Sequence, residues 1–122
     1  MLRIVGQDEE SLDRITDWIH DLWYDWPGWP GTDFELSDGR FCLELVDQEG
    51  FLNKEAVTTF RLCIHNVDSL EVKGKPNELP GQEEFNKFVY KPRENLLILK
   101  NCLTTEIWCT VRTLHVVLEQ LT

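Results

Sequence analysis

Three histidines are the residues of this chain best suited to proton transfer near neutral pH: His20, His65 and His115. His20 has the most promising neighbours, because Asp17 and Asp21 flank it and Tyr24 follows one turn later on a predicted helix. A carboxylate beside an imidazole can fix its tautomer and raise its basicity. The alternative is a histidine at the boundary of an apolar and an acidic helix face, which needs no chemical role. We keep His20 as a candidate binding residue.

A second group combines cysteine with histidine. Cys63 and His65 are two residues apart on a predicted strand, so their side chains share one face at a separation of about 6.5–7 Å. That separation is too long for a direct thiol–imidazole hydrogen bond. Cys42, on another predicted strand, could join them in a mixed Cys/His metal site, although the spacing matches no zinc motif. The chain has no CxxC pair and is not cysteine-dense, so we expect four free, mostly buried thiols: Cys42, Cys63, Cys102 and Cys109.

Motifs that would identify an enzyme are missing from the sequence. The chain contains no glycine-rich phosphate loop, no HExxH and no GxSxG. Three histidines are also too few for most multi-histidine metal sites. The sequence therefore predicts no catalytic residue, no cofactor and no metal, and it favours a non-enzymatic protein.

The stretch from Asp8 to Trp26 has the pattern of one amphipathic helix. Asp8 is a suitable N-cap, and Pro27 disfavours helical geometry in the residue before it. Apolar residues recur at steps of three and four and define a broad stripe: Leu12, Ile15, Trp18, Ile19, Leu22, Trp23 and Trp26. Aspartates recur every fourth residue on the opposite side: Asp13, Asp17, Asp21 and Asp25.

This aspartate row is the strongest candidate for a binding surface. Like charges four residues apart repel by about 0.2–0.5 kcal/mol per pair, so a basic partner would relieve an unfavourable arrangement. We expect His20 and Tyr24 on the flank of the row. Trp29, in a tandem Trp-Pro-Gly repeat, is expected on a turn where an aromatic ring can act as a binding platform. The alternative is a solvated acidic face, with Trp29 capping the core.

The charge of the chain is concentrated in its first part. Residues 1–50 contain 13 acidic and 3 basic side chains, which accounts for the formal net charge of −10, and residues 51–122 contain 9 of each. This balance disfavours binding to nucleic acid or to an anionic membrane surface. The sequence has no run of 18 apolar residues and no signal-peptide pattern at MLRIVGQDEE, so we expect a cytoplasmic protein.

The rest of the chain predicts antiparallel strands. After a short apolar segment at residues 2–5 and the helix, apolar and polar residues alternate around Phe41 and Phe60, and further strands are expected over 70–72, 85–91, 96–100 and 107–118. We therefore expect a single α+β domain over residues 1–122. One N-terminal amphipathic helix would pack on a mainly antiparallel, curled sheet of about six or seven strands, or a second copy would cover the remaining face.

The segment HDLWYDW, residues 20–26, resembles a loosely defined set of small bacterial proteins. In that set a His-Asp-x-Trp-aromatic-Asp segment precedes an antiparallel run of strands. The resemblance implies an α+β domain and brings no activity, cofactor or catalytic residue. The sequence leaves three hypotheses: an inhibitor, immunity or regulatory module that docks on a basic protein, a small enzyme or ligand-binding barrel using His20 or His65 at a helix–sheet pocket, and a structural domain that forms homodimers.

Overall fold

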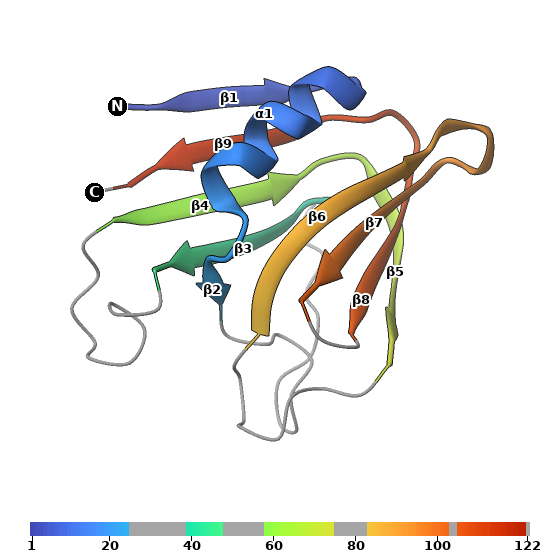
Figure 1. The fold of residues 1–122 in the computed structure, drawn as a ribbon. Coiled ribbons are helices and arrows are strands. Elements are labelled where there is room, and N and C mark those ends of the chain that lie inside the picture. Colours follow the sequence, from blue (N-terminus) through green and yellow to red (C-terminus); the bar gives the residue numbers. More distant parts are fainter. Residues whose placement is uncertain (25–38, 48–57, 75–82, 103–104, 122) are drawn as a thin grey trace.

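Over the residues it describes, the computed structural model shows one α-helix and a curled antiparallel sheet (Figure 1). It describes residues 1–24, 39–47, 58–74, 83–102 and 105–121. The described elements are β1 (Arg3–Gly6), α1 (Glu9–Ile19), β2 (Trp23–Tyr24), β3 (Phe41–Val46), β4 (Thr59–Ile64), β5 (Val67–Lys73), β6 (Glu83–Lys91), the 3-10 turn η1 (Pro92–Glu94), β7 (Leu96–Asn101), β8 (Glu106–Val111) and β9 (Val116–Gln120). The predicted α+β class is confirmed. Asp25, Trp29 and the Trp-Pro-Gly repeat lie outside the described residues.

Within the described ranges the sheet has nine strands in the order β1-β9-β4-β3-β2-β6-β7-β8-β5, and every neighbouring pair is antiparallel. The prediction of six or seven strands is too low for two reasons. The apolar run 107–118 is divided into β8 and β9, which pair with different neighbours, and residues predicted as helix form β2.

The helix starts where the sequence predicts and ends earlier. Asp8 accepts a hydrogen bond from the backbone N–H of Ser11 (2.8 Å), and the Ser11 hydroxyl accepts one from the Asp8 N–H, which completes a capping box. The last helical residue is Ile19. Asp21 then takes a left-handed backbone conformation (φ 67°), which aspartate tolerates better than most residues. The predicted helix end at Trp26 is therefore wrong.

The chain leaves the helix because the sheet offers its backbone other partners. The Asp21 N–H donates to the carbonyl oxygen of Phe85 (2.8 Å), and the Phe85 N–H donates to that of Leu22 (2.9 Å). Trp23 then pairs with Val46 on one side and Glu84 on the other. The short strand β2 thus joins two parts of the sheet, β1-β9-β4-β3 on one side and β6-β7-β8-β5 on the other. It also places Asp21 beside β6.

In the described part of the chain, one hydrophobic core joins the helix to both parts of the sheet. Leu12, Ile15 and Ile19 contribute the buried face of α1, and the sheet contributes inward residues such as Leu45 and Leu99. Figure 1 shows α1 lying across β1, β9 and β4 on one side and reaching β6 on the other. Along β3 and β4, core residues alternate with residues whose side chains face outward, away from the helix. No helix in the described part of the chain is long and apolar enough to cross a membrane.

Candidate functional site

The structure separates the residues of the predicted aspartate row. Asp13 and Asp17 are exposed on α1, whereas Asp21 lies beyond the end of the helix. His20 is exposed, and its Nδ1 lies 3.2 Å from Oδ2 of Asp21. An uninterrupted row on one helix, as predicted from the four-residue spacing, is therefore wrong, because the backbone turn at Asp21 ends the helical repeat.

Tyr24 is not a surface residue either. It is 1% exposed, and its hydroxyl donates to Oδ1 of Asn101 (2.7 Å). Asn101 in turn donates from Nδ2 to Oγ1 of Thr105 (2.7 Å). Burial raises the pKa of Tyr24 well above its ordinary value, and the nearby Glu83 carboxyl, itself buried, adds to the rise. Tyr24 therefore serves the core as a neutral hydrogen-bond donor, and the prediction that it lies on a binding surface is wrong.

A groove between α1 and β6 contains part of the acidic helix surface. It has a volume of about 230 Å³, and the exposed carboxylates Glu9 and Asp13 lie on its helix side. The half-buried rings of Phe88 and Tyr90 lie on its strand side. Neither His20 nor His65 lines this groove. The groove thus brings together two negative charges and two aromatic rings from segments far apart in the sequence.

Three potential metal ligands meet where the helix ends. Ligand atoms of Asp21, Glu84 and Cys102 all lie within 4.8 Å of one another. The Cys102 thiol donates to Oδ1 of Asp21 (3.9 Å), and it also lies 3.7 Å from the Phe85 carbonyl oxygen. Desolvation, followed by the two carboxylates, raises the pKa of Cys102 to about 12. At neutral pH the thiol is therefore protonated, with two carboxylates beside it.

This environment predicts that Cys102 reacts slowly although it is exposed. At pH 8 a pKa of about 12 in place of 9.0 leaves far less thiolate, so alkylation by iodoacetamide should be at least about a hundredfold slower than for the unfolded chain. The Asp21→Asn variant keeps a residue that tolerates the left-handed conformation and removes one carboxylate, so it should accelerate the reaction several-fold. The control Asp17→Asn should not. Alkylation of Cys102 at the unfolded-chain rate would contradict this description. Mass spectrometry of the labelled peptide gives both rates.

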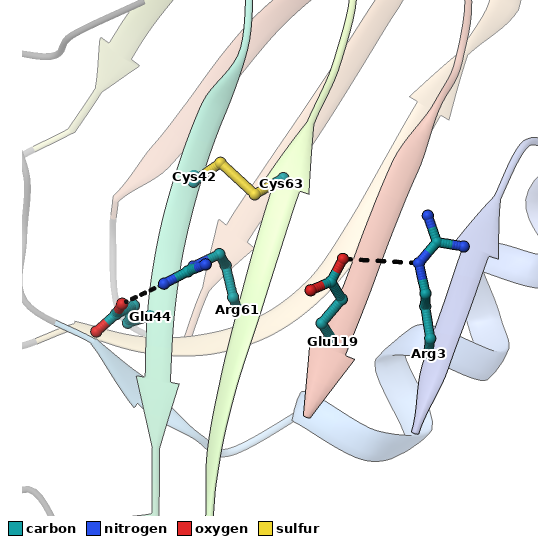
Figure 2. Close-up of a disulfide and its surroundings, with 6 residues drawn as sticks. All are labelled: Arg3, Cys42, Glu44, Arg61, Cys63 and Glu119. Atoms are coloured by element: carbon teal, nitrogen blue, oxygen red, sulfur yellow. Dashed lines mark hydrogen bonds and ion pairs between the residues drawn. A yellow bond between two sulfur atoms is a disulfide. The ribbon is translucent and has the colours of Figure 1, made fainter. Parts of the chain in front are cut away.

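The outer face of the sheet contains a disulfide bond between Cys42 and Cys63 (Figure 2). The two residues are directly paired on β3 and β4, with Cα atoms 4.1 Å apart, and neither side chain points into the core. Cys102 and Cys109 are the free cysteines. The prediction of four free thiols is wrong, because cysteine spacing in the sequence does not give the register between strands. The same pairing removes both sulfurs from the mixed Cys/His metal site considered above.

A row of alternating charges crosses the same face beside the disulfide. Glu44 is paired with Arg61, Arg61 with Glu119, and Glu119 with Arg3, across β3, β4, β9 and β1. Figure 2 shows the two ion pairs, Arg61 with Glu44 (3.1 Å) and Arg3 with Glu119 (3.6 Å). Opposite charges on neighbouring strands stabilise a sheet by about 0.2–1 kcal/mol per pair. The alternating charges therefore support this strand register.

Comparisons of the chain with protein-family models, curated proteins and solved structures gave no significant match. The candidate sites are consequently defined by geometry alone. The sequence predicts Cys63 and His65 on one strand face and allows Cys42 there too. It does not predict the disulfide, the arginines beside it or the aromatic side of the α1–β6 groove. The period-two pattern of β3 and β4 contained part of this information, because it predicts which side chains face outward.

Proposed function

We propose that this protein is a non-enzymatic interaction module that docks on a basic protein partner through the groove between α1 and β6. The observation that carries the proposal is the pairing of two carboxylates, Glu9 and Asp13, with two aromatic rings, Phe88 and Tyr90. A lysine or arginine side chain suits such a groove, since its charged end can meet the carboxylates while its stem packs on the rings.

Size and charge both support a protein partner. The groove volume of about 230 Å³ is below the roughly 300–1,000 Å³ of ordinary small-molecule pockets, but it can accommodate a side chain. The formal net charge of −10 would also attract a basic surface over a distance and accelerate association at low salt. Inhibitor, immunity and regulatory proteins are the classes that fit such a module. Neither histidine named in the enzyme hypothesis lies in this groove.

A set of lysine- and arginine-containing peptides tests this proposal without a known partner. Fluorescence anisotropy with labelled ten-residue peptides, at low and high salt, should show binding that weakens as salt rises. The Asp13→Asn variant should weaken binding about threefold to fivefold, as expected for an exposed charge pair. Tyr90→Leu should weaken it by a similar factor at both salt concentrations, because it removes ring contact and no charge.

The matched control is Glu71→Gln, which makes the same charge change on β5, away from the groove. Equal effects of Asp13→Asn and Glu71→Gln would mean that only net charge matters and would overturn the groove assignment. Absence of peptide binding, together with concentration-dependent dimers in sedimentation, would favour the self-associating domain instead.

A further inference from the structure

A second hollow lies on the outer face of the sheet, next to the disulfide. Its volume is about 170 Å³, and it is lined by Arg3, Arg40 and Arg61 together with Cys63, His65 and Glu119. The lining has a surplus of two positive charges, in a chain whose formal net charge is −10. This local reversal of charge is what an anionic ligand requires.

The arginines differ in how far they are neutralised. Arg3 and Arg61 form exposed ion pairs with Glu119 and Glu44, whereas Arg40 takes part in no ion pair within the described part of the chain. Burial lowers the pKa of His65, and the neighbouring His115, Arg40 and Arg3 lower it further. Arg3, Arg40 and His65 thus lie close to one another around the hollow.

The hollow also has a definite position relative to the sulfur–sulfur bond. Cys63 lines it, whereas Cys42 does not. Because the strand order is β9-β4-β3, Val117 of β9 flanks Cys63 on one side and Cys42 of β3 lies on the other. The hollow includes Val117 on the β9 side of Cys63, and it also includes Arg40, which directly precedes β3. A thiolate attacks a disulfide in line with the bond that breaks, so a thiol bound on the Val117 side of Cys63 would attack Sγ of Cys63 and displace Cys42.

We propose that this hollow binds a small anionic thiol, which opens the Cys42–Cys63 disulfide by attack on Sγ of Cys63. The ligand loses its thiol proton to solvent, and its sulfur forms a new bond to Cys63. The bond to Cys42 breaks, and the Sγ of Cys42 leaves with the electron pair and takes a proton from water. The ligand sulfur is oxidised and Cys42 is reduced, so the exchange needs no other oxidant or reductant. The arginines bind the anionic group of the ligand. This inference is independent of the α1–β6 groove.

Three small thiols of different charge test the proposal on the wild-type protein: 3-mercaptopropionate, 2-mercaptoethanol and cysteamine. After correction for the pKa of each thiol, the anionic compound should react at least about fivefold faster than the neutral one, and the cationic compound should be slowest. Peptide mapping of the trapped mixed disulfide should place the adduct on Cys63. Equal corrected rates, or an adduct mainly on Cys42, would overturn the proposal.

Variants then assign the effect to the hollow. Arg40→Gln should slow 3-mercaptopropionate about threefold and leave 2-mercaptoethanol unchanged, because it removes charge without changing the disulfide. Arg93→Gln, on η1, makes the same charge change away from the hollow and should have no effect. Equal slowing by both variants would show attraction to net charge alone and would also contradict a built anion site.

Discussion

Reduction of the Cys42–Cys63 disulfide should lower the free energy of unfolding by about 3 kcal/mol. The two cysteines are 21 residues apart, and a cross-link over a segment of about this length restricts the unfolded chain by roughly that amount. The outward position of both side chains means that reduction opens no cavity in the core. Urea unfolding with and without a reductant measures the difference.

The double variant Cys42→Ser/Cys63→Ser is the reference for the reduced protein. It should match the reduced wild type in stability, and the reductant should not change its unfolding curve. Alkylation of unfolded protein provides an independent count: two adducts, on Cys102 and Cys109, before reduction and four afterwards. Four adducts before reduction would show that the bond is absent.

The disulfide also shows which structural features the sequence predicts and which it does not. Period-two alternation correctly predicts β3 and β4 and their outward faces, because one side of each strand is buried in the core. A disulfide further requires that two cysteines face each other directly, which depends on the register between strands. Loop lengths and packing of the whole sheet determine that register, and single-strand patterns do not contain it.

The end of α1 is a second case. Leu22, Trp23 and Trp26 continue the helical spacing of Leu12, Ile15 and Ile19, so periodicity alone extends the helix. Instead, Asp21 and Leu22 form backbone hydrogen bonds with β6, and this tertiary contact outweighs the local preference for helix. The early end of the helix also breaks the predicted row of four aspartates. The candidate binding surface is instead formed by Glu9 and Asp13 together with aromatic residues about 75 positions later in the sequence.

The alkaline stability of the protein should depend mainly on two buried acids, Cys109 and Tyr24, and to a smaller extent on the exposed Cys102, whose pKa is also raised. Cys109 is 0% exposed, and burial raises its pKa from 9.0 to about 12. Burial also raises the pKa of Tyr24 above its ordinary value of 10.0. Above the ordinary values the unfolded chain releases these protons while the folded protein keeps them. The free energy of unfolding therefore falls as pH rises, from about pH 9 for Cys109 and from about pH 10 for Tyr24.

Above its ordinary pKa, each group lowers the free energy of unfolding by about 1.4 kcal/mol per pH unit. The two together should therefore lower it by about 4 kcal/mol between pH 8 and pH 11. Urea unfolding at several pH values measures this loss. Cys109→Ala should flatten the profile from pH 9 upward. Tyr24→Phe should flatten it above pH 10, although it lowers stability at neutral pH by about 1–3 kcal/mol because the buried Asn101 loses its donor.

Tyr90→Phe is the matched control, since it removes the other tyrosine hydroxyl of the chain from a half-buried position on β6. Its pH profile should follow the wild type. If Cys109→Ala and Tyr24→Phe also keep the wild-type slope, the alkaline loss arises from other groups, and the two buried acids do not retain their protons in the folded state. If both variants flatten the profile and Tyr90→Phe does not, the loss reflects the burial of Tyr24 and Cys109 in the shared core.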